Sequence, residues 1–168
     1  EKPPALSAAE LDAVGHSLDR RPGRVLLYGF NHRHHGSVRD ALALVRSGRL
    51  GRVLHLRGFY GKSAVAEVEG NWRADRDLAG GGILMDQGIH MLDLMRCFAG
   101  EFDQVMSLVQ DRHWRLGVED DAFALMRARG GAVAQLHSSA TSWRHRFELH
   151  VGCERGALQL DGVLSGSM

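Results

Sequence analysis

The sequence predicts an α+β fold, in which helices cover one face of an open and mostly antiparallel sheet. Two observations support this prediction. Helical patterns and short apolar runs alternate over the first 100 residues, and a regular alternation of apolar and polar residues follows Gly100. Helices followed by a run of strands are typical of α+β domains, in which the second sheet face is left for a partner. The 168 residues fit one domain.

Composition and charge place the chain among ordinary globular proteins. Hydrophobic residues make up 44% and charged residues 24%, and 21 Lys and Arg balance 20 Asp and Glu. A net charge near zero argues against binding to nucleic acid or to a membrane surface. We expect no signal peptide and no membrane-spanning helix. The sequence therefore predicts a cytoplasmic protein with a small-molecule partner, and with Cys97 and Cys153 reduced.

A helix is predicted near the start of the chain. Ser7 and Glu10 have the spacing of a capping box, whose side chains satisfy the free backbone donors of a first turn. The helix should continue to about residue 18 and bury one apolar stripe, formed by Leu11, Val14 and Leu18.

Two predicted strands enclose a second predicted helix. The apolar run RVLLYGF at 24–30 predicts a buried strand, and Ser37 should then cap a helix through about Val45. Residues 51–61 alternate in the way that is typical of a strand with one wet face. Residues 61–79 show no clear period, so we expect a loop of the kind that often lines a site.

Five alternating segments follow Gly100, and we expect them to pair in chain order as an antiparallel meander. Gly130-Gly131 predicts a hairpin between the second and third segments, and GCERG predicts a turn between the fourth and fifth. The segments are residues 103–111, 121–129, 132–140, 146–152 and 157–164.

A third helix, predicted from about Ile83 to Phe98, carries an acid, an imidazole and a second acid. Asp86, His90 and Asp93 would lie within roughly 60° of one another on an α-helix, so we expect them to act together. A carboxylate one turn from an imidazole fixes its tautomer and raises its proton affinity, which suits a general acid/base. From spacing alone, a solvated polar face explains them as well. Core contacts are expected from Leu84, Ile89, Leu92, Met95 and Phe98.

Glycines in and before this helix suggest a close approach. Glycine costs about 1 kcal/mol inside a helix relative to alanine, so something should lie against Gly88. Glycines 80–82 would leave backbone N–H groups open to a substrate oxygen or a phosphate, or they form a flexible linker.

Zinc is the other chemistry that the histidines suggest. His90 with a neighbouring acid, together with the HRHH segment at 32–35, offers imidazole ligands. The Cys and His spacings of structural zinc sites are absent, so we expect no metal and interpret HRHH as a solvated turn between a strand and a helix.

Several motifs together resemble the Gfo/Idh/MocA oxidoreductases, which join an N-terminal Rossmann domain to a C-terminal α+β domain. The resemblance extends over the whole chain and implies that residues 1–168 form a substrate-binding and oligomerising domain, with residues 1–5 as the end of the dinucleotide-binding domain. The motifs are EKP at 1–3, YGFNHRH at 28–34, GRLGRV at 48–53, NWR at 71–73 and GGGILMDQGIHMLDL at 80–94.

The resemblance implies three catalytic residues. Lys2 matches a lysine that hydrogen-bonds the reacting hydroxyl or carbonyl, and Asp86 matches a carboxylate that binds substrate and orients the pair. His90 matches the general acid/base that takes the hydroxyl proton while a hydride leaves to NAD or NADP. Asp93 would be a supporting group, and Lys2 and Pro3 would contact the cofactor.

Substrate-binding residues are also implied. A tryptophan for ring stacking with several hydrogen-bond donors suits a sugar or an anionic sugar derivative such as a nucleotide sugar. Alternatively, Trp72 is a buried loop anchor and Arg73 a solvated charge. The implied residues are Asn31 and Arg33, in an N-x-R turn, and Lys62, Asn71, Trp72 and Arg73, in the substrate loop.

The chain departs from the family by lacking a strand followed by G-x-G-x-x-G. We therefore expect the substrate half of a longer NAD- or NADP-dependent dehydrogenase that acts on a secondary alcohol or ketone of a sugar, polyol or nucleotide sugar, and no activity from this part alone. A homodimer or homotetramer should form through the open sheet face. The alternatives are a non-catalytic sugar- or cofactor-binding regulator of the same fold and an NAD-dependent glycosidase.

Overall fold

The computed structural model describes residues 2–63 and 72–163. Its helices are α1 (Ala8–Asp19), α2 (Gly36–Arg46), α3 (Arg76–Ala79) and α4 (Ile89–Ala99), and its shorter turns are the 3₁₀ segments η1 (Asn31–His34) and η2 (Trp72–Ala74) and the π-helical η3 (Leu84–Gly88). Its strands are β1 (Val53–Gly61), β2 (Phe102–Gln110), β3 (Asp121–Ala128), β4 (Val133–Ser139), β5 (Arg146–Cys153) and β6 (Gly156–Asp161).

The strands form one six-stranded sheet in the order β2-β3-β4-β1-β5-β6. β1 runs parallel to β4 and antiparallel to β5, and all other neighbours are antiparallel. The predicted α+β fold with a mostly antiparallel open sheet is confirmed. The predicted meander is wrong, because β1 is inserted between β4 and β5. Period-two alternation fixes which face a strand buries, but it does not specify the neighbouring strand.

Both predicted turns are confirmed. The β3–β4 hairpin turns at Gly131, whose φ of 92° is in the left-handed region that favours glycine. The β5–β6 hairpin pairs Cys153 with Gly156 across a two-residue turn.

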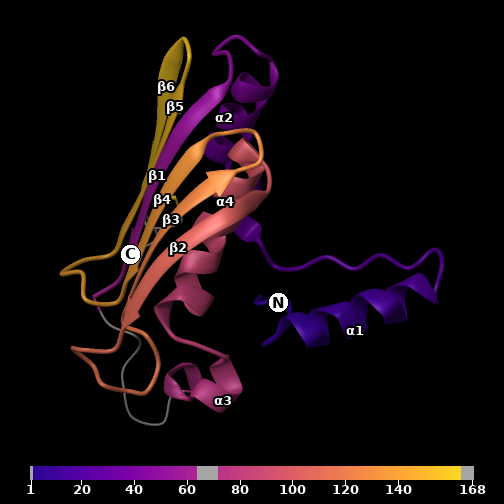
Figure 1. Ribbon diagram of the computed structural model, residues 1–168, viewed down its shortest axis with the longest axis vertical. Coiled ribbons are helices and arrows are strands. Elements are labelled where there is room, and N and C mark those ends of the chain that lie inside the picture. Colours follow the sequence, from indigo (N-terminus) through magenta and orange to yellow (C-terminus); the bar gives the residue numbers. More distant parts are fainter. Residues whose placement is uncertain (1, 64–71, 164–168) are drawn as a thin grey trace.

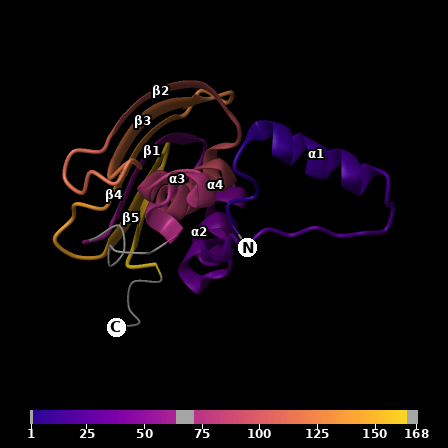
Figure 2. The same cartoon turned by 90° about the horizontal axis from the view of Figure 1, so that it is seen from below.

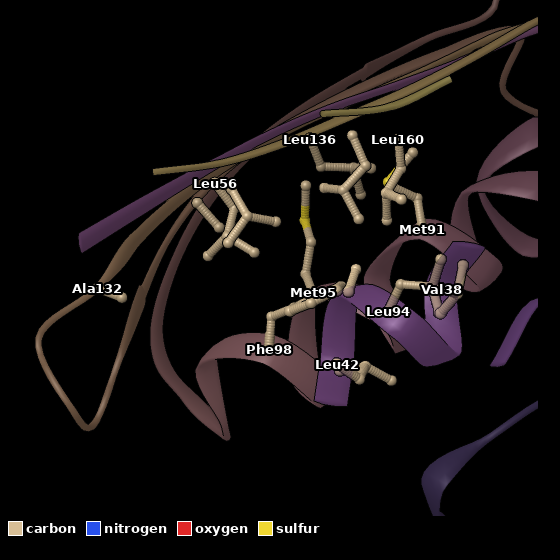
Figure 3. Packing of buried hydrophobic residues seen from close by; sticks show 14 of the residues in the cluster. Val38, Leu42, Leu56, Met91, Leu94, Met95, Phe98, Ala132, Leu136 and Leu160 are labelled. Carbon is tan, nitrogen blue, oxygen red and sulfur yellow. The ribbon is translucent and has the colours of Figure 1, made fainter. Parts of the chain in front are cut away.

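Helices α2 and α4 cover one face of the sheet, and the other face is bare (Figures 1 and 2). The core lies between these two layers (Figure 3). On α4 the fully buried side chains are Met91, Leu94 and Met95, whereas the predicted Leu84 and Leu92 are only partly buried. Leu84 and Leu92 nevertheless pack against the core, as predicted. Other core residues are Val38, Leu42, Leu56, Phe98, Leu136 and Leu160.

Helix α1 and the segment that follows it stand away from the sheet (Figures 1 and 2). The capping box is confirmed, since the Ser7 hydroxyl accepts from the Glu10 amide at 3.2 Å. The predicted burial of the α1 stripe is wrong, because no residue of α1 is buried. Residues 24–30 form no strand, and Val25 and Leu27 are 84% and 83% exposed. Their apolar pattern is that of a buried strand, but no described strand pairs with them.

Across residues 2–63 and 72–163, no helix has both the length and the hydrophobicity required to cross a bilayer.

Candidate active site

Asp86, in the π-helical turn η3, is the centre of a cluster of cations. Lys2 donates from Nζ to Asp86 Oδ1 at 2.9 Å and also to the Asp86 carbonyl oxygen. Lys62, just beyond β1, donates to Asp86 Oδ2 at 3.4 Å, and Arg73 Nε lies 3.7 Å from Oδ1. The structure thus brings cations from three separate parts of the chain to the Asp86 carboxylate. Asp86 orients Lys2 and Lys62 through direct ion pairs.

The Asp86 carboxyl is ionised at neutral pH. Burial alone would raise its pKa. Hydrogen bonds from Gln87 and Lys2, with the nearby charge of Lys62, outweigh burial and hold the pKa well below its usual range. Both carboxylate oxygens already contact protein donors, so the predicted direct binding of substrate by Asp86 would require it to share them.

His90 lies in the first turn of α4 and is 5% exposed. Its Nδ1 atom is buried and has no hydrogen-bond partner within residues 2–63 and 72–163. Burial lowers the pKa of His90 to about 4, and the positive charges of Lys2 and Lys62 act in the same direction, against the attraction of Asp86. The predicted increase in proton affinity is therefore wrong, because desolvation outweighs the carboxylate. His90 is neutral at pH 7 and able to accept a proton.

His32, predicted to lie in a solvated turn, is instead 3% exposed and stacked on His90. The ring centroids are 4.1 Å apart and the planes differ by 23°. Its Nε2 lies 3.2 Å from the Tyr60 hydroxyl and its Nδ1 lies 3.1 Å from Asn31 Oδ1. Burial, with the charges of His90 and Lys2, lowers the pKa of His32 to about 3.

Sequence reasoning missed both His32 and Tyr60 as members of the site. One signal was present for Tyr60, which shares the apolar face of the alternating 53–61 segment with Leu56. No local pattern indicated His32, whose burial depends on the turn η1 packing against α4.

Asp93, which was predicted to act together with Asp86 and His90, pairs with Arg33 of η1. Asp93 is 4% exposed and accepts both Nε, at 2.6 Å, and Nη2 of Arg33. This two-point pair ties η1 to α4. Arg33, predicted to bind substrate, is 46% exposed but commits two donors to Asp93, and Asn31 contacts His32 rather than the cations around Asp86.

Trp72 and Arg73 line a small pocket beside Asp86. Trp72 is 50% exposed, so the buried-anchor alternative is wrong for this residue. The Arg73 guanidinium lies 4.5 Å from the centre of the Trp72 ring, in a cation–π arrangement. Lys2 and Asp86 complete the polar wall of this pocket of about 90 Å³. The predicted substrate residue Asn71 lies outside the described residues.

The amides at the start of η3 are not open to a ligand. Gly82 N donates to Glu119 Oε2 at 2.8 Å, and Leu84 N donates to Oε1 at 3.1 Å. Ile83 N donates to the Glu119 carbonyl at 3.0 Å. A Cβ atom at Gly82 would collide with the Glu119 backbone. The predicted substrate or phosphate site at these amides is therefore wrong, because a loop glutamate occupies them.

The predicted close approach at Gly88 is confirmed, and it comes from the protein itself. A Cβ atom there would lie 2.9 Å from Ser138 Cβ on β4. Gly88 lets the helix lie directly on the sheet, next to His90.

A larger cavity of about 780 Å³ lies between α1, residues 26–30 and α4. Its wall is mostly apolar, and Pro3 and Met85 also line the small pocket beside Asp86, so the two cavities adjoin. Within residues 2–63 and 72–163, no three His, Cys, Asp or Glu side chains are placed to hold a metal ion.

The match to known proteins agrees with this arrangement. Residues 38–159 match the model of the GFO/IDH/MocA C-terminal domain. The chain belongs to the GFO/IDH/MocA family. Among its relatives, 1,5-anhydro-D-fructose reductase of Ensifer adhaerens is 32% identical over 161 residues, which cover 89% of this chain and 46% of the relative.

Levoglucosan dehydrogenase of Pseudarthrobacter phenanthrenivorans is 31% identical, again over 89% of this GFO/IDH/MocA chain and 46% of the relative. The chain therefore spans about half the length of these curated relatives. The solved structure of a levoglucosan dehydrogenase in complex with NADH and levoglucosan superposes with a TM-score of 0.82 and 22% identity, over 90% of this chain and 44% of that one. That likeness concerns the fold.

Proposed function

We propose that this GFO/IDH/MocA chain is the substrate-binding half of an NAD- or NADP-dependent oxidoreductase, which interconverts a secondary alcohol and a ketone on a sugar, polyol or nucleotide sugar. The observation that supports it best is the neutral, buried imidazole of His90 beside Lys2, whose ammonium is held by the ionised Asp86. The sugar reductase and dehydrogenase named among the relatives support the same class of reaction.

In the proposed reaction His90 is the general base. Its Nδ1 atom is enclosed, so Nε2 accepts the hydroxyl proton of the substrate. Lys2 stabilises the negative charge that develops on the substrate oxygen, because a fixed ammonium in a partly buried site attracts an alkoxide strongly. Asp86 fixes the direction of the Lys2 ammonium. In the opposite direction, protonated His90 returns the proton to the new alkoxide.

The cofactor, when bound, accepts or supplies the hydride. The residues of this chain would contact only the nicotinamide end of the cofactor. Pro3 and Met85 form an apolar wall between the two cavities, next to Lys2. No glycine-rich phosphate loop occurs in the sequence. We therefore propose that residues 1–5 end a dinucleotide-binding domain and that Lys2 and Pro3 border the nicotinamide.

In the substrate pocket, Trp72 would stack on a sugar ring and Arg73 and Lys62 would donate to its hydroxyl or anionic groups. Arg33 and Asn31 are proposed to shape the site through Asp93 and His32.

A turnover assay tests this function. The complete protein that contains this chain would be incubated with NAD or NADP and a panel of sugars, and formation of the reduced cofactor would be followed by absorbance. His90→Ala should lower kcat by roughly 100-fold or more, because proton transfer contributes about that factor, with cofactor affinity retained. Arg39→Ala, an exposed change on α2, is the matched control and should leave kcat unchanged.

The outcomes of the assay also separate the alternatives. Stoichiometric binding of sugar with no cofactor reduction on any substrate would favour a regulator. Cleavage of a glycoside without net accumulation of NADH would favour a glycosidase. Unchanged turnover in His90→Ala would remove His90 from the mechanism.

We also propose a homodimer or homotetramer that covers the bare sheet face. On that face Met106, Leu108 and Leu125 are 74%, 78% and 51% exposed, and side chains on neighbouring strands combine into an apolar patch. A cytoplasmic location is proposed as well, in which the free thiols of Cys97 and Cys153 would stay reduced. Light scattering and cell fractionation test these two proposals.

A further inference from the structure

We propose that His32 is a positioning residue for His90. Its neutral ring, held by Asn31 and Tyr60, is the surface against which the His90 imidazole packs, and we call this ring the seat of His90. The catalytic meaning of this seat rests on the proposed function, but the seat itself does not.

The need for such a seat follows from the surroundings of His90. A histidine that transfers protons is ordinarily oriented by a hydrogen bond to its second ring nitrogen. His90 Nδ1 has no such partner within residues 2–63 and 72–163. Ring contacts remain, with His32 stacked at 4.1 Å and the edge of Phe30 at 6.0 Å and 82°. Stacking on one face and an edge contact on another fix a ring plane without a hydrogen bond.

The His32 ring is itself fixed in place by its own contacts. Both of its nitrogens have partners, Asn31 Oδ1 at 3.1 Å and the Tyr60 hydroxyl at 3.2 Å. The ring also lies 5.8 Å from the Phe147 ring, in the core beneath the sheet. His32 therefore connects η1, β1 and β5 to the face of His90.

This hydrogen-bond pattern selects one form of His32. Asn31 Oδ1 can only accept, so His32 carries its proton on Nδ1, and Nε2 accepts from the Tyr60 hydroxyl. Burial raises the pKa of Tyr60 to about 12, with a smaller contribution from Asp86, so the hydroxyl keeps its proton. A second proton on His32 would have to displace this donor. The His32 ring that stacks on His90 is thus neutral, with its proton on Nδ1 and its lone pair on Nε2.

A neutral seat matters because of the charges around the two imidazoles. Lys2, Lys62 and Asp86 face His90, and Lys2, His35 and Asp93 face His32. When His90 takes up a proton, a second imidazolium 4.1 Å away would oppose it, whereas a neutral ring presents a π face to the new cation. Because the two rings are stacked, His32 also covers one face of His90 and excludes water from it.

Nitrogen-15 NMR of the imidazoles in this 168-residue chain tests the proposal, because the spectra report the tautomer and the titration of each histidine without any turnover. In the native chain His32 should show a single Nδ1–H tautomer. In His32→Ala, water reaches the exposed face, so the pKa of His90 should rise from about 4 by at least about one pH unit toward its ordinary value. His32→Phe keeps the stacked ring and should keep the low pKa.

The matched control is His145→Ala. His145 packs edge-on against the same Tyr60, at 5.6 Å, and its removal should leave the His90 titration unchanged. An unchanged His90 in folded His32→Ala, an equal rise in His32→Phe, or an equal rise in the control would each overturn the proposal. If His32→Ala does not fold, Asn31→Ala decides: the Tyr60 hydroxyl can donate or accept, so loss of the Asn31 acceptor should give a mixture of His32 tautomers, and a single unchanged tautomer would overturn the proposal. None of these results depends on whether the protein oxidises a sugar.

Discussion

Residues 24–30 and residues 53–61 have similar strand-like sequences, and the structure treats them in opposite ways. β1 pairs with a strand on each side, and its Leu56 and Tyr60 are 2% and 3% exposed. The 24–30 segment pairs with no described strand, and its Val25 and Leu27 are almost fully exposed. An apolar strand pattern therefore indicates that a segment requires burial, but it does not identify the part of the protein that buries it.

The same contrast separates two regions of the molecule. The sheet with α2 and α4 forms a closed core, whereas α1 and the 24–30 segment present apolar side chains to the 780 Å³ cavity and to solvent. A dinucleotide-binding domain, as proposed above, would be a suitable partner for this second region. Changes in the two regions should thus have different consequences for the isolated chain.

The largest expected difference concerns leucine truncation. Leu56→Ala in β1 should lower the free energy of unfolding by about 3 kcal/mol, because it removes buried methyl groups and leaves a cavity. Leu27→Ala should change it by less than about 0.5 kcal/mol, because that side chain is 83% exposed. Urea denaturation of the 168-residue chain measures both. Equal effects would show that residues 24–30 are buried in solution and would break the comparison.

The free energy of unfolding should depend on pH through the two buried histidines, His32 and His90, and not through the exposed N-terminal region. His32 and His90 have pKa values of about 3 and 4 in the folded chain, below the ordinary value of 6.5. The unfolded chain therefore binds protons first, and stability that is complete above about pH 7 is lost as the pH falls. Between about pH 7.5 and 5.5 each histidine should remove about 1 kcal/mol.

His32→Phe, which cannot take up that proton, should flatten this slope. The check is a series of urea transitions across the pH range, with the exposed His16→Phe as the control. A slope that is the same in both variants would mean that His32 is accessible to water in the folded chain.

The smallest expected effects are a pair of glycine substitutions with opposite signs. Gly88→Ala places a methyl group 2.9 Å from Ser138 Cβ, and the resulting overpacking should cost about 1 kcal/mol after the gain in helix propensity. Gly15→Ala in α1 meets no atom within 4 Å, so it should raise the helicity of α1, with a local gain of up to about 1 kcal/mol. Thermal unfolding and circular dichroism distinguish the two. A stabilised Gly88→Ala would show that α4 does not lie so close to β4.

Local chemistry in the sequence predicted local structure well. The capping box at Ser7, the hairpin at Gly131 and the close approach at Gly88 each follow from the properties of one or two residue types. The pairing of Lys2 with Asp86, 84 residues apart, came from the family resemblance and not from spacing.

Features that depend on tertiary packing were out of reach. The stacking of His32 on His90 requires η1 to be docked on α4, and the pairing of Arg33 with Asp93 requires the same docking. The low pKa of His90 depends on burial by several elements, so a rule based on one neighbouring carboxylate gave the wrong direction.

Glu119, in the loop between β2 and β3, has a consequence for protein engineering. Its carboxylate and carbonyl together hold the three amides that begin η3. A chimera that transplants residues 80–93 into a related scaffold would carry Asp86 and His90 but leave behind the group that holds the amides of residues 82–84. Recombination libraries built from these proteins should keep the loop and the helix on the same fragment.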